Sequence, residues 1–263
     1  MSKSGSFRAI GVIPARMGSS RYPGKPLVKI AGIPMVEHVR RRALLCECLA
    51  DVVVATCDRE IVDVVGAMGG RAVMTSASHE RCTDRVEEAA RGLQADVFVT
   101  IQGDEPLLLP EWIEGVVHPF NDEKVGCTNL LSKLEGREDL MNPNIVKAAC
   151  DVSGHILFFT RRFQAMYPDL AETPVFRQTG IQAFRAGLLR EFSRLESTPF
   201  EMTESVDMFR LIEHGRPIHG VVMDAPTYGV DRPEHVAQIE ALLRDDPVQK
   251  KLHDRIAEMA VAR

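Results

Sequence analysis

Short apolar runs alternate with helical hydrophobic patterns through the first hundred residues of the chain. Four β-branched or apolar runs predict strands at residues 10–13, 52–55, 71–74 and 97–101. The segments between them predict helices from Pro34 to about Cys46, over 59–68, and from about Thr83 to Leu93. Because strands and helices alternate, we expect right-handed crossovers and an α/β fold with a doubly wound, mostly parallel sheet.

This fold class predicts where a ligand binds. In open α/β sheets, ligands occupy the crevice at the carboxyl ends of the strands. The corresponding loops of this chain are residues 14–26, 55–58, 75–82 and 102–106.

The pattern changes over residues 120–225. Strands are predicted at 125–134, 145–151 and 155–159 without helices between them, and helices follow at 186–195 and 200–214. We interpret 120–225 as an antiparallel lobe inserted into a single domain that spans 1–263. A strand at 218–222 and an amphipathic helix to about Leu243 return to the first pattern. Antiparallel strands leave edges and apolar surface, so the lobe predicts a homodimer.

Composition narrows the class of protein. The 263 residues are 45% hydrophobic and 26% charged, with a net charge of -5, which is typical of a soluble globular chain and gives no basic field for nucleic acid. We find no apolar run long enough to cross a membrane and no signal-peptide core, so we expect a cytoplasmic protein without a membrane partner. The six cysteines have neither zinc nor redox spacing, and we expect reduced, packed thiols.

The loop at 14–26 carries the strongest chemical signal. It joins a strand to a helix and contains Arg16, Arg21 and Lys25, so backbone N–H groups and three cations can converge on a phosphate. It matches neither the P-loop nor the dinucleotide fingerprint. A solvated loop shaped by its glycines and prolines is the alternative.

Two aspartates are candidate metal ligands. Asp104 follows the fourth strand, and Asp231 precedes a helix that begins near Pro233. Mg²⁺ takes one or two protein carboxylates and leaves its other positions to water and phosphate. A turn or a helix cap is the alternative at each position, and the separation of 127 positions between the two aspartates leaves their pairing open.

Four motifs together resemble one enzyme family. They are Pro14-Ala15-Arg16 through Lys25-Pro26-Leu27, Gln102-Gly103-Asp104-Glu105-Pro106, Asn142-Pro143-Asn144-Ile145-Val146-Lys147 and Gly229-Val230-Asp231-Arg232-Pro233-Glu234. In this order the chain resembles the 3-deoxy-manno-octulosonate cytidylyltransferases, or CMP-Kdo synthetases. The resemblance implies a Rossmann-like nucleotidyltransferase fold, a dimer, and transfer of CMP from CTP to an acidic 3-deoxy sugar with release of pyrophosphate and use of Mg²⁺.

The resemblance also implies roles for single residues. Lys25, Asp104 and Asp231 would be catalytic, and the two aspartates would hold the metal. The implied nucleotide-binding residues are Ala15, Arg16, Arg21, Lys25, Thr75 and Gln102. The implied acceptor-binding residues are Arg177, Gln178, Gln182, Glu204, Asp207 and Met208. Phosphoryl transfer of this kind needs positioning and charge neutralisation and no enzyme nucleophile.

Departures from the family pattern fall around the base and the acceptor. Ala-Thr-Asp becomes Ala55-Thr56-Cys57, and Ser-Gly-Thr-(Glu or Asp)-Arg becomes Arg81-Cys82-Thr83-Asp84-Arg85. On the acceptor side, histidine and tyrosine become Gln178 and Gln182, and glutamate and glutamine become Asp207 and Met208. These changes predict an altered acceptor, such as an 8-amino Kdo analogue, another acidic sugar or a phosphonate.

Other interpretations stay open at these positions. A salt bridge is the alternative for Arg177, and a core position is the alternative for Met208. A non-catalytic nucleotide-binding protein is the alternative for the whole chain, but the presence of both Asp104 and Asp231 argues against it.

Overall fold

The computed structural model describes residues 7–19, 21–163, 174–226 and 228–259. Its strands are β1 (Ala9–Ala15), β2 (Lys29–Ile30), β3 (Ile33–Pro34), β4 (Leu49–Thr56), β5 (Arg71–Met74), β6 (Val97–Ile101), β7 (Cys127–Ser132), β8 (Lys147–Cys150), β9 (Ile156–Thr160), β10 (Val175–Arg185) and β11 (His219–Met223). Its α-helices are α1 (Met35–Ala43), α2 (Arg59–Ala67), α3 (Cys82–Ala90), α4 (Pro110–Val117), α5 (Arg137–Met141), α6 (Ala186–Phe192), α7 (Pro199–Glu204), α8 (Phe209–Glu213), α9 (Glu234–Asp245) and α10 (Pro247–Glu258).

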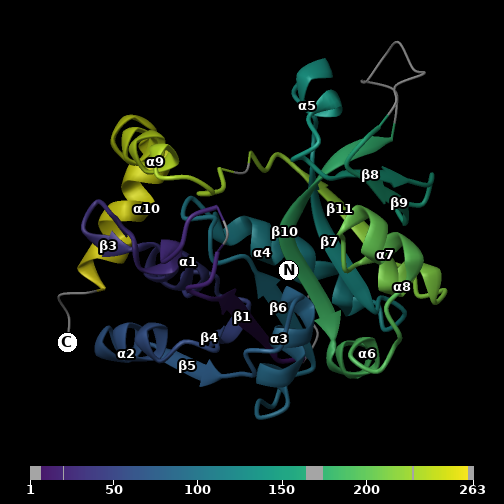
Figure 1. Ribbon diagram of the computed structural model, residues 1–263, viewed down its shortest axis with the longest axis horizontal. Coiled ribbons are helices and arrows are strands. Elements are labelled where there is room, and N and C mark those ends of the chain that lie inside the picture. Colours follow the sequence, from purple (N-terminus) through teal and green to yellow (C-terminus); the bar gives the residue numbers. More distant parts are fainter. Residues whose placement is uncertain (1–6, 20, 164–173, 227, 260–263) are drawn as a thin grey trace.

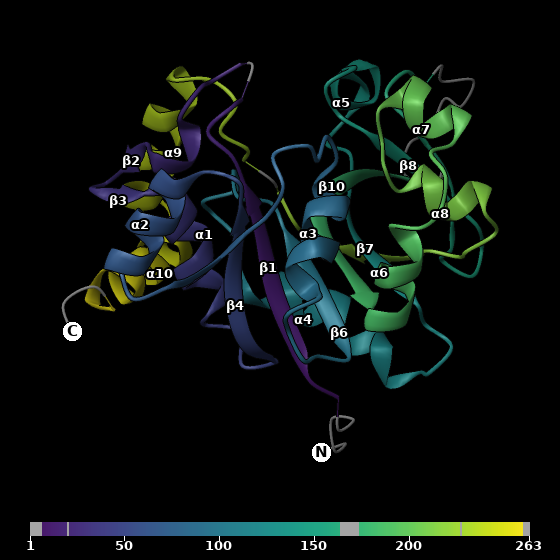
Figure 2. The same cartoon turned by 60° about the horizontal axis from the view of Figure 1, so that its bottom comes forward.

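The central sheet has the order β11-β7-β10-β6-β1-β4-β5 and is mostly parallel, which confirms the predicted α/β class. β10 runs antiparallel to both β6 and β7, and β8 and β9 extend the sheet from β10. The antiparallel strands predicted within 120–225 are therefore continuous with the parallel sheet. Helices α9 and α10 lie beside α1 on one side of the molecule, and β8, β9, α7 and α8 lie on the other (Figure 1; Figure 2).

Alternating side chains of the central strands fill two separate cores. On β1, Ala9 and Ile13 belong to the core beneath α1, α2 and α4, whereas Ile10 and Val12 belong to the core beneath α3, α6 and α8. Successive residues of a strand point to opposite faces, so the two cores cover both faces of the sheet. This burial explains why the central strands are continuous apolar runs.

Most predicted elements are confirmed within a few residues, and four differences matter. β10, α4 and α10 were not predicted, and the helix predicted at 200–214 consists of two helices, α7 and α8. The break falls at Ser205, whose φ of 54° is left-handed and ends α7. In the described part of the chain, no helix has the length and apolar character needed to span a bilayer. The N-terminal residues used to assess a signal segment lie outside the described residues.

Candidate active site

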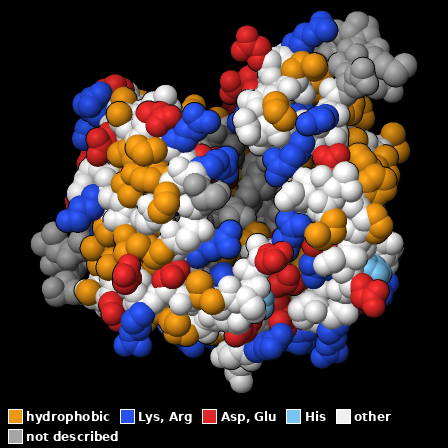
Figure 3. Space-filling view, in the orientation of Figure 1, with side chains coloured by type: hydrophobic (Ala, Val, Ile, Leu, Met, Phe, Trp, Pro, Cys, Tyr) orange, Lys and Arg blue, Asp and Glu red, His pale blue; other side chains and the backbone are white. Residues whose placement is uncertain are grey.

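A cavity of about 280 Å³ opens at the carboxyl ends of β1 and β6, at the edge predicted from the fold class. The loop after β1 forms one wall and the loop before α3 forms the other. Lysine and arginine side chains surround the hollow on this face (Figure 3). The residues that line it include Pro14, Ala15, Arg16, Ser19, Arg21, Lys25, His79, Arg81, Cys82, Arg85, Gln102, Gly103 and Asp104.

Lys25 is the residue of the loop after β1 that contacts both aspartates. Gly24, with a φ of 76°, turns the chain so that Lys25 begins a short 3₁₀ turn (Lys25–Leu27). The ammonium Nζ lies 2.5 Å from Oδ2 of Asp104 and 3.3 Å from Oδ1 of Asp231, and it donates to the carbonyl of Val230 at 3.2 Å. Arg21 Nη1 contacts the other carboxylate oxygen of Asp231 at 2.9 Å.

The two aspartates therefore lie on the same side of the cavity. The backbone N–H of Val230 donates to the carbonyl of Asp104 at 2.9 Å, which joins the segment before α9 to the loop after β6. Since both carboxylates reach one ammonium, their oxygens converge on a point that a cation can occupy. Among the described residues no group of three or more His, Cys, Asp and Glu side chains is arranged for a metal, but two carboxylates suffice for Mg²⁺ when phosphate supplies further oxygens.

The other residues implied to bind nucleotide differ in whether they line the cavity. Ala15 and Arg16 line the cavity beside Gln102. Thr75 is buried, and its hydroxyl accepts a hydrogen bond from Nη1 of Arg85 at 2.5 Å. Thr75 is thus a support for Arg85, which itself lines the cavity.

Three residues implied to bind the acceptor are engaged inside the protein. Oδ2 of Asp207 accepts from the hydroxyl of Thr83 at 2.7 Å, at the first turn of α3. Glu204 accepts from the backbone N–H of Arg161 at 2.8 Å, and Met208 is fully buried in the core beneath α8. The described lining of the cavity contains none of Glu204, Asp207 and Met208.

The acceptor candidates on β10 form a polar layer behind the cavity. Arg177 Nη2 lies 3.2 Å from Oδ1 of Asp139, and the Gln178 amide donates to Oδ1 of Asn129 at 2.8 Å. Gln182 is 4% exposed, and its Oε1 has no partner among the described residues. Gln182 is therefore a buried candidate on β10 whose side-chain oxygen lacks a hydrogen-bond partner among the described residues.

Glu105 is a further polar group next to β10, and the sequence motifs did not single it out as a site residue. Its carboxylate accepts from the backbone N–H of Gly180, and its Oε2 is buried. Burial, with a smaller contribution from the charge of Asp104, raises the pKa of Glu105 to about 8. Glu105 thus links the loop after β6 to β10.

The family model for cytidylyltransferases matches residues 10–218, which include β1, the phosphate loop and most of the sheet. A 3-deoxy-manno-octulosonate cytidylyltransferase of Syntrophobacter fumaroxidans is 40% identical over 248 residues, which cover 92% of this chain and 99% of the relative. The chain belongs to the cytidylyltransferase family.

Other relatives agree with this assignment. A cytidylyltransferase of the same name from Geotalea daltonii is 37% identical over 251 residues, covering 91% of this chain and 99% of the relative. The solved structure of CMP:2-keto-3-deoxy-manno-octonic acid synthetase complexed with CTP has a TM-score of 0.85 and 35% identity, and the match covers 91% of this chain and 99% of that chain. The sequence resemblance to this branch of the cytidylyltransferases is thereby confirmed.

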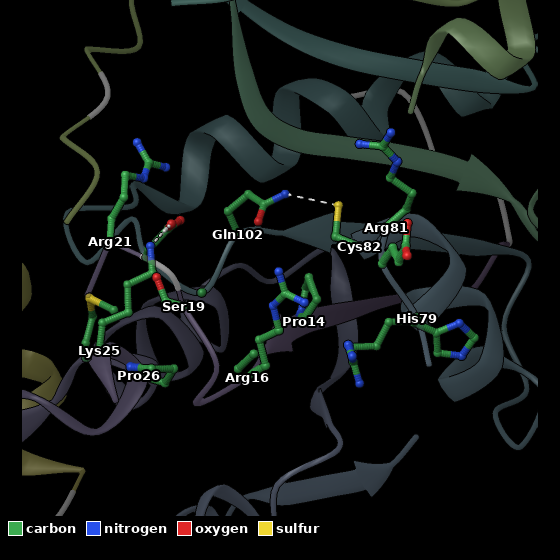
Figure 4. Close-up of a pocket in the computed structure, with 16 residues that line it drawn as sticks. Pro14, Arg16, Ser19, Arg21, Lys25, Pro26, His79, Arg81, Cys82 and Gln102 are labelled. Carbon is green, nitrogen blue, oxygen red and sulfur yellow. Dashed lines mark hydrogen bonds and ion pairs between the residues drawn. The ribbon is translucent and has the colours of Figure 1, made fainter. Parts of the chain in front are cut away.

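Several cavity residues of this cytidylyltransferase were not singled out as site residues from the sequence. Arg81 Nη1 donates to the hydroxyl of Ser205 at 2.9 Å, and His79 pairs with Glu88. Cys82 lies against Gln102 (Figure 4). All three cavity residues lie within the 75–82 loop, which the rule that ligands bind at carboxyl strand ends had indicated as a segment without naming its residues.

Proposed function

We propose that this cytidylyltransferase transfers CMP from CTP to Kdo or a closely similar acidic sugar and releases pyrophosphate. The observation that carries the proposal is the convergence of Lys25, Asp104 and Asp231 beside the loop of Arg16 and Arg21. Relatives that match nearly the whole chain bear the name of this activity, and the solved relative holds CTP. The matches cover both the phosphate loop and the acceptor side of the sheet.

The residues of the chain supply position and charge for the reaction. Arg16, Arg21 and Lys25 would bind the triphosphate and hold its α-phosphorus in front of the acceptor. A hydroxyl oxygen of the sugar then bonds to the α-phosphorus while the bond to the bridging oxygen of the β-phosphate breaks. Pyrophosphate leaves with that electron pair, and the hydroxyl proton passes to water.

Asp104 and Asp231 fit a metal ion in this scheme. Enzymes of this kind generally use a divalent metal, and we propose Mg²⁺ because both candidate ligands are carboxylates and the substrate brings phosphate oxygens. When bound, Mg²⁺ supplies positive charge to the phosphate oxygens. Lys25, which contacts both carboxylates in this structure, would then turn toward the triphosphate.

The choice of acceptor depends on four changed positions, and the side chains of three of them are held by contacts with other parts of the protein. Gln178 pairs with Asn129, Asp207 caps α3 through Thr83, and Met208 lies in the core. Their side chains therefore give weak support to a different acceptor, and Kdo is the acceptor that we propose. Gln182 is the changed position that still bears on an amino-sugar analogue or another acidic sugar.

Pyrophosphate release tests the function. The protein is incubated with CTP and Mg²⁺, with or without Kdo, its 8-amino analogue, other acidic sugars and a phosphonate. We expect release that depends on Kdo, and the specificity constants rank the acceptors. Absence of release with every acceptor would refute cytidylyl transfer, and a higher specificity constant for another acceptor would refute the choice of Kdo.

Assembly and location are part of the proposal. Four apolar side chains on β9 and α7 are exposed, namely Leu157, Phe158, Phe200 and Met202. A second copy of the chain would cover such a surface, so we expect a homodimer. Sedimentation that gives a monomer at working concentration would contradict this expectation. Because the reaction consumes CTP, we place the enzyme in the cytoplasm.

A further inference from the structure

Three side chains form a hydrogen-bonded chain along one wall of the cavity. Nε2 of Gln102 lies 3.4 Å from Sγ of Cys82, and this Sγ lies 3.6 Å from Oδ2 of Asp207. The same Oδ2 accepts from the hydroxyl of Thr83 at 2.7 Å and from its backbone N–H at 3.4 Å. Asp207 is thus held at the first turn of α3. Cys82 contacts it on one side and Gln102 on the other.

The chemistry of the three groups fixes the direction of the hydrogen bonds. An ionised carboxylate only accepts, so the Cys82 thiol donates its proton to Asp207. Burial, together with the charge of Asp207, raises the pKa of Cys82 to about 12, so the thiol keeps this proton at neutral pH. The sulfur then has only lone pairs to offer Gln102, and the Gln102 amide must present its NH₂ group.

Packing holds the rest of the Gln102 side chain. A Cβ placed at Gly180 would lie 2.1 Å from Cγ of Gln102 and 2.8 Å from its Cβ, so the stem of Gln102 rests directly on the β10 backbone. With the stem held by Gly180 and the NH₂ group held by Cys82, the amide oxygen turns away from Cys82 toward the phosphate-loop side of the cavity (Figure 4).

We propose that Cys82 and Asp207 are positioning residues that orient the Gln102 amide, so that its oxygen accepts a hydrogen bond from a hydroxyl of the acceptor sugar. An amide oxygen needs a donor, which the phosphates lack and which the hydroxyls of the acceptor sugar and the ribose and base of CTP all offer. The resemblance implies a nucleotide role for Gln102; we assign its oxygen to the acceptor because Gln102 packs on β10, the strand that carries the acceptor candidates Gln178 and Gln182. Figure 4 shows Gln102 between Cys82 and the triphosphate cations Arg21 and Lys25. The identity of the ligand rests on the proposed function.

Cysteine variants test the positioning role. Cys82→Ala removes both hydrogen bonds, and we expect kcat/KM for the acceptor to fall roughly tenfold while the Kd of CTP, measured by calorimetry without acceptor, stays unchanged. Cys82→Ser keeps a donor and an acceptor and should recover most of the loss. Cys48→Ala, a half-buried cysteine remote from the cavity lining, is the matched control and should behave as wild type.

Two kinetic results would overturn the inference. The first is a Cys82→Ala enzyme with wild-type acceptor kinetics. The second is a loss that the CTP affinity shares equally, or that Cys82→Ser does not recover, because a general structural defect would produce either pattern.

A second measurement separates this inference from the proposed function. The side-chain NH₂ signals of Gln102 in ¹⁵N NMR spectra are identified by their loss in Gln102→Glu. We expect slow proton exchange of this NH₂ group in the wild type and in Cys82→Ser, and fast exchange in Cys82→Ala. If the wild type uses no acceptor, the proposed function fails and this exchange pattern still decides the inference. Equal exchange in wild type and Cys82→Ala overturns it.

Discussion

Replacement of Lys25 by methionine should affect stability and catalysis in ways that reveal its two roles. Methionine keeps most of the length of the side chain and removes the ammonium that contacts Asp104 and Asp231. The two carboxylates then lose the ammonium between them, and Asp104 loses its ion pair while Arg21 still contacts Asp231, which lowers the stability of the protein. The same change removes a charged contact to the triphosphate.

The contacts of Lys25 set the size of the effect. Its side chain is 14% exposed, whereas those of Asp104 and Asp231 are 30% and 33% exposed. Hydrogen bonds to charged groups contribute about 1.5–3 kcal/mol, and solvent access to the carboxylates weakens the pairs. We expect Lys25→Met to lower the free energy of unfolding by about 1–3 kcal/mol in EDTA and to lower kcat/KM for CTP roughly ten- to a hundredfold.

Urea denaturation in EDTA and in millimolar Mg²⁺ separates the two roles. Mg²⁺ should restore part of the lost stability of Lys25→Met, because it can occupy the position between the carboxylates that the ammonium leaves. The control is Lys29→Met, which removes an exposed lysine on β2. Equal stability of Lys25→Met and wild type in EDTA would refute the neutralising role of Lys25. Equal responses of all three proteins to Mg²⁺ would refute a cation position shared by Asp104 and Asp231.

Two further predictions concern packing and pH. Gly180→Ala should displace the Gln102 side chain and lower acceptor turnover at least tenfold in the pyrophosphate assay, whereas Gly187→Ala, where an added Cβ meets open space, should not. Burial lowers the pKa of His38 from 6.5 to about 4, so its stabilising effect is complete above pH 6.5 and is lost as the pH falls toward 4. Urea denaturation should show a loss of about 2 kcal/mol from this group between pH 7 and pH 5, which His38→Gln should abolish. A His38→Gln protein with the wild-type pH dependence would contradict that origin.

The parallel part of the sheet could be predicted because its strands are buried on both faces. β4 and β6 are nearly continuous apolar runs, and the helices between them have clear apolar stripes. β10 could not be found in this way. Its residues Arg177, Gln178 and Gln182 interrupt the apolar pattern, and polar contacts inside the protein, such as that of Gln178 with Asn129, hold part of this layer. Hydrophobic periodicity does not report a polar layer of this kind.

For α10, in contrast, the sequence did carry a signal. Asp246 precedes Pro247, and the Asp246 side chain accepts from the backbone N–H groups of Val248 and Gln249. An aspartate cap followed by proline at the first helical position is typical of a helix start. The prediction of a helix to about Leu243 matches α9, and α10 was missed because this start signal was not used.

The placement of Asp104 could be predicted, but its approach to Asp231 could not. Topology alone puts Asp104 at the carboxyl edge of β6. Asp231 reaches it because Val230 packs into a small core with Ile30 and Met35 and bonds to the Asp104 backbone. These contacts join Val230 to residues between 126 and 200 positions away in the sequence, and no local pattern predicts them.

Asp207 illustrates that a matched motif predicts the location of a residue better than the function of its side chain. The family pattern has glutamate there and glycine at the position of Cys82, and the two departures look unrelated because 124 residues lie between them. In the structure they are in contact, since the Cys82 thiol donates to the Asp207 carboxylate. Aspartate is one methylene shorter than glutamate, and a thiol extends from Cα where glycine has no side chain. The two departures therefore meet beside Gln102, because the Cys82 side chain contacts both Asp207 and Gln102.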